Sequence, residues 1–197
     1  MPMTASKTRD MLVDVARQLF ARMGVDNTTM NDIAQASKKG RRTLYTYFKS
    51  KNEIYLAVVG SELDQLYKML QDVAAKDLPA DEKLITFLYA RLDAIKALVF
   101  RNGTLRANFF RDIWRVEKIR KNYDILETEL IKDILKAGVK EGIFSMPDID
   151  STASVLHHAL KGLEVPYIRG IMGDDTSQRI KRRESVMNLI FNGIKIK

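Results

Sequence analysis

Apolar side chains recur at helical spacing from the start of the chain. Six of them are separated by three, one, three, one and three positions, which places them on one face of an amphipathic helix. They are Leu12, Val15, Ala16, Leu19, Phe20 and Met23. Gly24 follows directly and favours the left-handed conformation that ends many helices. The pattern predicts a helix that ends at Met23.

Two shorter helices are predicted next. Thr29, with Asp32 three residues later, resembles a capping box and predicts a helix to about residue 36. Ser37-Lys38-Lys39-Gly40 supplies a turn, and a third helix is predicted over residues 41–48.

Ser50 with Glu53 is a second predicted capping box, and it opens a long helix. The apolar stripe of this helix is Val59, Leu63, Leu66, Leu70 and Val73. Further helices are predicted over 82–100, 104–114, 116–140, 151–165 and 177–195. No alternating strand pattern of useful length occurs, so the predicted fold is all-α.

Positive charge is concentrated at the N-terminus. The net charge is +8, and residues 1–51 hold ten Lys/Arg and four acids, a net +6. The other 146 residues hold 23 basic and 21 acidic side chains, a net +2. Such a distribution indicates a polyanionic partner, either nucleic acid or an anionic membrane surface. No apolar run approaches the ~20 residues of a membrane helix, and we expect a cytoplasmic protein without membrane contact.

Catalytic and metal-binding signatures are missing from the sequence. Cysteine is absent, and the chain has no nucleophile elbow, phosphate loop, HExxH or dinucleotide fingerprint. His157 and His158 are adjacent on a predicted helix and point in different directions, so we expect one packed, one exposed and no metal site. We expect no enzyme activity and no cofactor.

The two short helices and their turn describe a helix-turn-helix. Helical spacing places Leu44 and Phe48 on one side of the second helix. The opposite side carries Arg41, Arg42, Tyr45 and Thr46. Residues 37–51 contain six Lys/Arg and no acid. This arrangement suits a helix that enters the major groove of DNA.

From about residue 7 to residue 59 the chain resembles the N-terminal domain of TetR/AcrR-family regulators. The segments that carry the resemblance are Ala16-Arg17-Gln18-Leu19-Phe20, Met23-Gly24, Thr28-Thr29, Asp32-Ile33-Ala34 and Thr43-Leu44-Tyr45-Thr46-Tyr47-Phe48-Lys49-Ser50-Lys51-Asn52-Glu53. The chain departs from the family in the turn, where Lys38 replaces a glycine and is expected to adopt positive φ. Gly40 replaces a serine cap, and Arg42 replaces a small residue.

The resemblance implies a helix-turn-helix DNA-binding domain over residues 1–50 and a larger helical ligand-sensing and dimerisation domain over residues 51–197. Base contacts are expected from Arg41, Arg42, Thr43 and Thr46. Phosphate contacts are expected from Tyr45, Tyr47, Lys51 and Thr29, and Lys39 is included among the DNA-binding residues. A homodimer is expected to bind a palindromic double-stranded operator, and repression relieved by a small-molecule effector is the default.

The same resemblance implies where the dimer and the effector bind. The last two predicted helices are expected to pair with their symmetry mates through Leu156, Leu160, Leu163, Val186, Ile190 and Ile194. The effector pocket is expected among residues 84–141, lined by Phe87, Phe109, Phe110, Trp114 and Arg111. Basic groups near such a lining suit an amphipathic or anionic ligand.

Three alternatives remain open from the sequence. The first is a transcriptional activator of the same family. The second is a basic helical protein that binds DNA or membranes without sequence preference. The third is an enzyme with an appended helix-turn-helix. The third needs a polar catalytic constellation in residues 80–197, and the sequence offers none.

Overall fold

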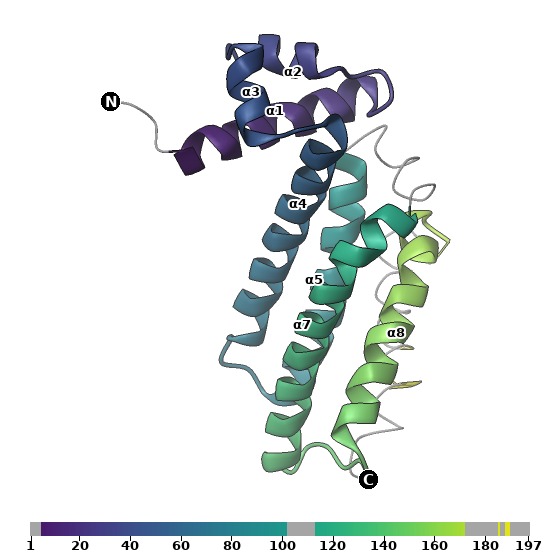
Figure 1. Ribbon diagram of the computed structural model, residues 1–197. Helices are drawn as coiled ribbons and strands as arrows, with labels where there is room; N and C mark the ends of the chain where they lie inside the picture. Colours follow the sequence, from purple (N-terminus) through teal and green to yellow (C-terminus); the bar gives the residue numbers. More distant parts are fainter. Residues whose placement is uncertain (1–4, 102–112, 172–184, 186–187, 190–197) are drawn as a thin grey trace. The chain divides into compact units, whose positions relative to one another are not determined.

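The computed structural model describes residues 5–101 and 113–171, together with residues 185, 188 and 189 (Figure 1). Within these residues it contains helices and no strand, which confirms the predicted all-α fold. The helices are α1 (Ala5–Met23), α2 (Met30–Ala36), α3 (Arg41–Tyr47), α4 (Lys51–Ala74), α5 (Ala80–Arg101), α7 (Ile113–Lys140) and α8 (Ile149–Ile168).

The chain divides into two compact units. The first contains α1, α2, α3, α4 up to Gln65, α5 from Leu98 and α7 up to Lys121. The second contains the remaining parts of α4, α5 and α7, together with α8. The predicted boundary at residue 50 lies inside the first unit, immediately before α4 begins, and the assignment of a role to each domain stays a prediction.

Local signals set the ends of the N-terminal helices. Gly24 has φ of 88° and donates its N–H to the Phe20 carbonyl at 3.0 Å, so α1 ends where the sequence predicts. The core of the first unit includes six fully buried side chains, Leu12, Ala16, Phe20, Ile33, Leu44 and Ile54. The helix-turn-helix is therefore held by one apolar core that α1 and α4 complete.

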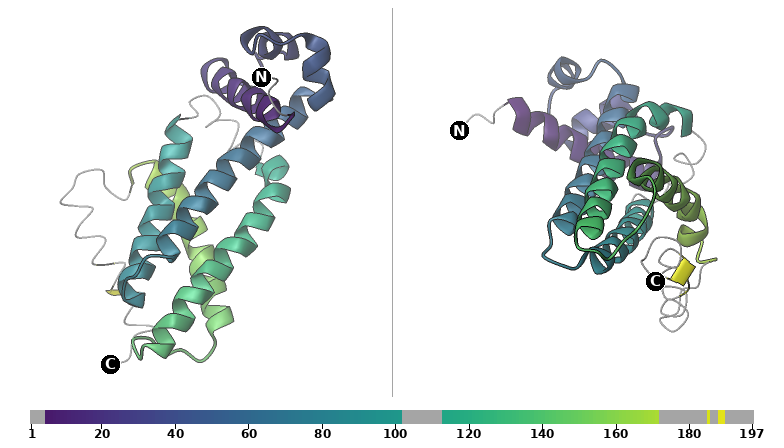
Figure 2. Two further views of the ribbon diagram at one scale, coloured as in Figure 1. Left: turned by 90° about the vertical axis from the view of Figure 1, so that its left-hand side faces the viewer. Right: turned by 90° about the horizontal axis from the view of Figure 1, so that it is seen from below.

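In the second unit, segments of α4, α5, α7 and α8 run side by side (Figure 2). Their core includes Leu70, Leu84, Leu88, Ile131 and Leu135. α8 is N-capped by Asp148, whose carboxylate accepts hydrogen bonds from the Asp150 and Ser151 N–H groups at 2.9 and 3.3 Å.

Two predicted helices lie largely outside the described residues. These are the helix over 104–114, of which only the last two residues fall in α7, and the helix over 177–195. In the described parts of the chain, no helix is long and apolar enough to cross a membrane.

Candidate nucleic-acid interface

The turn between α2 and α3 is closed by backbone hydrogen bonds. Lys38 has φ of 52°, as its replacement of a glycine predicts. Its N–H donates to the Gln35 carbonyl at 3.0 Å, and the Lys39 N–H donates to the Ala34 carbonyl at 3.0 Å. The buried Ser37 hydroxyl also donates to the Ala34 carbonyl, at 3.0 Å. A left-handed conformation at a residue with a side chain costs about 1–2 kcal/mol, and the four bonded residues hold Lys38 in it.

The N-terminus of α2 carries the predicted capping box. The Thr29 hydroxyl accepts from the Asp32 N–H at 3.1 Å, while the Thr29 N–H donates to the Asp32 carboxylate at 2.8 Å. The hydroxyl donates to the same carboxylate at 2.8 Å. The backbone hydrogen bond from Thr29, with the hydroxyl bond, lowers the pKa of Asp32. Thr29 is exposed, but the predicted phosphate position at this helix end already holds a carboxylate.

α3 presents the two faces that its sequence predicts. Leu44 is fully buried and Phe48 is 3% exposed. Arg41, Arg42, Tyr45 and Thr46 are exposed, on the opposite side. Thr43 and Tyr47 are half-buried, and Tyr47 packs against the core of the first unit. α3 is therefore anchored by two apolar side chains, with its arginines directed away from the protein.

The start of α3 is capped more weakly than that of α2. Gly40 occupies the N-cap, as predicted, and makes no side-chain hydrogen bond. Arg9 of α1 lies with its guanidinium carbon 5.2 Å from the centre of the Phe48 ring, at the other end of α3. A cation over an aromatic face is attractive. The C-terminal end of α3 is thereby tied to α1.

The predicted capping box at residues 50–53 forms in a modified way. The Ser50 hydroxyl accepts from the Glu53 N–H at 3.2 Å, as expected. The Glu53 carboxylate accepts from the Lys49 N–H at 2.7 Å, one residue before the usual partner. Because Phe48 is extended at the end of α3, the Lys49 N–H has left the helix and needs an acceptor.

Lys51 is engaged within the protein. Its ammonium group donates to the Val25 carbonyl at 2.7 Å and to the Asp26 carbonyl at 3.2 Å. These carbonyls belong to the loop after α1, so Lys51 joins that loop to the first turn of α4. The phosphate contact expected of Lys51 stays a prediction, and sequence reasoning missed its role as a clamp.

The cations of the helix-turn-helix are not neutralised internally. Among the described residues, no ion pair involves Lys38, Lys39, Arg41 or Arg42. Lys39 is half-buried and the other three are exposed. Uncompensated cations on one helix and its preceding turn are the electrostatic footprint of a nucleic-acid interface.

The residues expected to sense an effector are only partly described. Phe87 is fully buried in the core of the second unit. Phe109, Phe110 and Arg111 lie outside the described residues, and so does the side chain of Trp114, whose backbone belongs to α7. Within the described parts of the chain, no group of three or more His, Asp or Glu side chains is arranged to hold a metal ion.

Of the residues expected at the dimer interface, those on α8 are described and the other three are not. On α8, Leu160 is 5% exposed and belongs to the core of its own unit. Leu156 and Leu163 are half-buried, and the neighbouring Val155 is 67% exposed. Val186, Ile190 and Ile194 lie outside the described residues.

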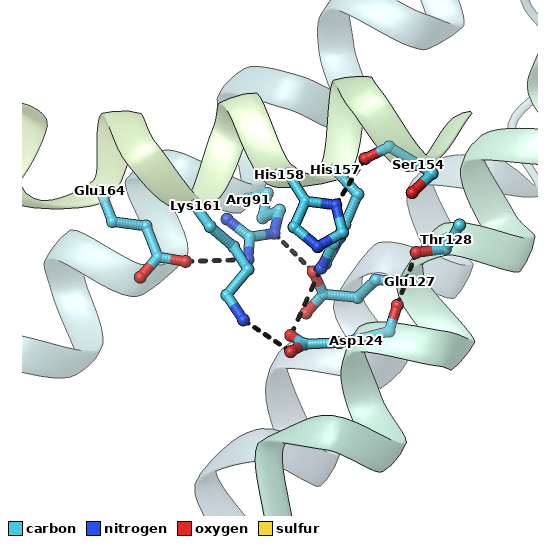
Figure 3. A network of polar contacts seen from close by, with 9 residues as sticks. All are labelled: Arg91, Asp124, Glu127, Thr128, Ser154, His157, His158, Lys161 and Glu164. Carbon is cyan, nitrogen blue, oxygen red and sulfur yellow. Dashed lines mark hydrogen bonds and ion pairs between the residues drawn. The ribbon is translucent and has the colours of Figure 1, made fainter. Parts of the chain in front are cut away.

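A buried polar network in the second unit escaped sequence reasoning (Figure 3). We use this name for Arg91 of α5, Asp124 and Glu127 of α7, and His157, Lys161 and Glu164 of α8. Arg91 donates from Nε to Glu127 at 2.5 Å and from Nη2 to Glu164 at 2.9 Å. Burial acts to lower the pKa of Arg91, but the two carboxylates outweigh burial and raise it. Arg91 is therefore a permanent buried cation.

His157 completes the network, while His158 is exposed, as expected for adjacent helical residues. His157 is 1% exposed, with Nε2 lying 3.4 Å from Asp124 and Nδ1 lying 3.7 Å from Glu127. Lys161 donates to the other oxygen of Asp124 at 2.6 Å. A sequence signal did exist, because Arg91 continues the apolar stripe of Leu84 and Leu88 at helical spacing.

The chain is similar to known bacterial regulators, both in its N-terminal region and along most of its length. The profile of "Bacterial regulatory proteins, tetR family" matches residues 12–58. The transcriptional repressor KstR2 of Rhodococcus jostii (strain RHA1) is 30% identical over 154 residues, which cover 74% of the chain and 71% of KstR2. The transcriptional regulator QacR of Staphylococcus aureus (strain Mu50 / ATCC 700699) is 21% identical over 189 residues, covering 94% and 97%.

A solved structure shares the fold along almost the whole chain. A transcriptional regulator of the TetR/AcrR family from Thermobifida fusca YX-ER1 has a TM-score of 0.71 and 24% sequence identity. The match covers 95% of the chain and 98% of that structure. The likeness therefore extends beyond the helix-turn-helix into the larger helical part.

Proposed function

Because the chain belongs to the TetR family of bacterial regulatory proteins and is a DNA-binding transcriptional regulator, we propose that it represses transcription as a homodimer on a palindromic operator. A small-molecule effector then releases the dimer from the DNA. The relatives KstR2 and the acrEF/envCD operon protein of Escherichia coli are described as repressors, which favours repression over activation.

One observation carries the proposal of sequence readout. α3 exposes Arg41 and Arg42, which have no ion-pair partner among the described residues, while Leu44 and Phe48 fix its other face in the core. A guanidinium that is free of carboxylates can bind both acceptors of a guanine in the major groove. A rigid anchor matters equally, because base discrimination requires a helix held in one register.

The remaining contacts follow from position on or beside α3. We assign the exposed Thr46 and the half-buried Thr43 to base edges. We assign the exposed Tyr45 to a phosphate, together with Tyr47 and Lys39, which are half-buried. Such phosphate contacts fix position and carry no sequence information themselves.

Thr29 and Lys51 are already engaged in hydrogen bonds within the protein. The Thr29 hydroxyl is shared with Asp32, and the Lys51 ammonium with two carbonyls of the loop after α1. We assign both as residues that position α2 and α4, with any phosphate contact secondary to that role.

The proposed dimer uses α8. Leu156 and Leu163 are seven positions apart, lie on one side of α8 and remain half-buried, beside the more exposed Val155. Paired with a symmetry mate, this side would bury apolar surface that the single chain leaves in water. On a palindromic operator, the two copies of α3 in a dimer would occupy successive major grooves, roughly 34–36 Å apart.

The proposed release by an effector is a population shift. A ligand that prefers the conformation with the wrong separation of the two α3 helices lowers operator affinity by its differential affinity for the two states. Glu62 of α4 supports a route within the first unit, because its buried carboxylate contacts Arg17 of α1 at 3.6 Å and also Arg101 at the end of α5. A shift of α5 would reach α1 through this carboxylate.

Selection of bound sequences from random double-stranded DNA tests the proposal. We expect enrichment of a palindrome with two half-sites about one helical turn apart. Recovery of unrelated sequences with equal affinity would contradict it and favour a basic helical protein without sequence preference.

A further inference from the structure

The buried polar network lies where α5, α7 and α8 meet in the second unit, and its side chains converge from all three helices (Figure 3). Arg91, Glu127 and His157 are each less than 5% exposed. Charged groups at such depth are retained only when hydrogen bonds and opposite charges compensate them. A polar atom of this network that lacks a hydrogen-bond partner therefore marks a place where a further partner would bind favourably.

Three nitrogen atoms of the network lack a hydrogen-bond partner within the described residues. They are Nη1 of Arg91 and both ring nitrogens of His157. The carboxylates beside the His157 ring, at 3.4 and 3.7 Å, are within ion-pair range but beyond hydrogen-bond geometry. Leaving a buried donor unsatisfied costs about 1–3 kcal/mol, so a partner beyond the described residues, such as a bound molecule, would stabilise these atoms.

The chemistry of Arg91 restricts that partner. Nη1 is a donor and needs an acceptor, which an ammonium group cannot supply. A ligand carboxylate would be the third anion on one guanidinium, which Glu127 and Glu164 already contact at 2.5 and 2.9 Å. Repulsion between carboxylates is strong where water is excluded. An uncharged oxygen satisfies the donor without this repulsion.

His157 accepts the same class of group. A neutral imidazole has one N–H donor and one acceptor nitrogen, so it can donate to a carbonyl or hydroxyl oxygen and can accept from a hydroxyl. Leu88 and Leu92, which lie three residues before and one residue after Arg91 on α5, are apolar and buried. A ligand that reaches the network is therefore apolar apart from a few polar atoms.

We infer that Arg91 and His157 are the polar anchors of the effector site, and that the effector is an uncharged, mostly apolar molecule bearing a hydroxyl or carbonyl oxygen. The inference rests on the proposed function, since it names the ligand that releases the protein from DNA. The sequence suggested an amphipathic or anionic ligand, and the buried polar network favours the uncharged class over the anionic one.

A matched set of probes separates the ligand classes. Cyclohexanol, cyclohexanone, cyclohexanecarboxylate and cyclohexylammonium share one ring and differ in the charge of their polar group. The chain contains two histidines, so the imidazole nitrogen–proton NMR spectrum has two sets of signals. The exposed His158 is identified by its loss in His158→Gln, which leaves the His157 signals as the probe of the network.

We expect cyclohexanol and cyclohexanone to shift the His157 signals saturably, and the two charged probes to leave them unchanged at equal concentration. The inference is overturned if a charged probe shifts them as strongly, or if neither neutral probe does. His158→Gln is the matched control, and its response to every probe is expected to equal that of the unmodified chain.

Glu164→Gln tests whether repulsion by the carboxylates on Arg91 is what excludes an anionic ligand. The glutamine carbonyl can still accept from Arg91, but one of the two anions on the guanidinium is gone. We expect affinity for cyclohexanecarboxylate to rise about tenfold or more, while affinity for cyclohexanol stays within about threefold. Unchanged rejection of the carboxylate by a folded variant would contradict the charge argument.

The titrations contain no DNA. Failure of the neutral probes therefore leaves operator binding untouched, whereas failure to enrich an operator leaves the probe results standing. The two proposals can fail separately.

Discussion

The exposed side chains of α3 differ in how free they are to contact a base. Arg41 and Arg42 have no ion-pair partner among the described residues, and their guanidinium groups are exposed. Thr46 already donates its hydroxyl to the Arg42 carbonyl at 3.0 Å, so it can only accept from DNA. Base discrimination at this interface depends chiefly on the two arginines.

We expect Arg41→Ala and Arg42→Ala each to weaken operator binding by about 1–3 kcal/mol and to relax the preference at one position per half-site. The matched control is Lys49→Ala, which removes an exposed cation outside α3 and should weaken all sequences alike. Fluorescence anisotropy on single-base operator variants measures both. Base preference altered by Lys49→Ala and unaltered by both arginine variants would reverse the assignment.

Lys38 provides a test of the turn. Because its φ is 52°, we expect Lys38→Gly to raise the free energy of unfolding by about 1 kcal/mol. Among the described non-glycine residues only Lys38 has positive φ, so Lys39→Gly is the control and should not stabilise. Urea denaturation measures both changes. Equal effects of the two substitutions would show that the turn is not strained.

The residues of the interface were predictable where their partners are close in sequence. The Thr29–Asp32 capping box follows from a local motif, and the positive φ of Lys38 follows from the resemblance to a family that has glycine at this position. The partners of Lys51 lie about 25 residues away in the loop after α1, and no local pattern identifies them. Its carbonyl contacts therefore emerged only from the folded chain.

At the scale of elements, helix ends in this chain depend on carboxylates. Hydrogen bonds from Ser151 and Asp150 lower the pKa of Asp148 below its ordinary value of 3.8, and Asp32 is lowered by Thr29. A carboxyl whose pKa is lower in the folded state adds stability above its unfolded pKa. That stability is lost as the pH falls through the folded pKa.

We therefore expect the melting temperature to fall on acidification below pH 3.8, as Asp148 and Asp32 are protonated. Asp148→Asn keeps an acceptor at the start of α8 but cannot titrate, so its melting temperature should depend less on pH in this range. Thermal melts of both proteins across the acid range give the comparison. If the melting temperatures of the two proteins depended equally on pH, Asp148 would not contribute to the acid sensitivity.

The last turn of α7 packs against the loop that follows it. A Cβ added at Gly138 would lie 2.1 Å from Cδ2 of Phe144, whose side chain is 1% exposed. We expect Gly138→Ala to lower the free energy of unfolding by about 1–3 kcal/mol, despite the better helix propensity of alanine.

Gly60 of α4 is the matched control for this substitution, because a Cβ there meets nothing within 4 Å. Gly60→Ala should stabilise the protein, by up to about 1 kcal/mol. Denaturant titrations of the two variants should move in opposite directions. Stabilisation by Gly138→Ala would show that the Phe144 ring moves aside freely.

The elements themselves were largely predictable, since the ends of α1, α2, α3 and α4 coincide with caps, glycines and apolar stripes in the sequence. The sequence did not allow us to predict which side of α8 faces the core of its own unit. The stripe read as a dimer surface contains Leu160, which the structure buries in its own unit together with His157 and Glu164. Spacing alone cannot tell which partner covers an apolar stripe.

At the scale of the whole molecule, long-range pairing decides what the sequence leaves open. Arg91 meets Glu127 and Glu164 across separations of 36 and 73 residues. Arg91 stands out because it continues an apolar stripe, but Glu127 and Glu164 by themselves each look like a solvated side chain on a helix. Only the packing of α5, α7 and α8 brings them into one buried polar network.

The proposed dimer is tested on the side of α8 that carries the half-buried Leu156 and Leu163. We expect Leu156→Glu combined with Leu163→Glu to yield monomers, because two charges would have to be buried in the proposed interface. Val139→Glu, at an exposed valine of α7, is the control and should leave the dimer intact. Sedimentation at micromolar concentration distinguishes the outcomes. An unmodified chain that sediments as a monomer would contradict the proposed homodimer.

The central claim is that a dimer reads a specific operator through α3. The most direct measurement compares binding of the selected palindrome with that of the same DNA with both half-sites scrambled, at equal, physiological salt. We expect a preference on the order of a thousandfold or more for the palindrome, with two protomers bound to each site. Equal affinity for the two DNAs would contradict the account and leave a protein that binds DNA by charge alone.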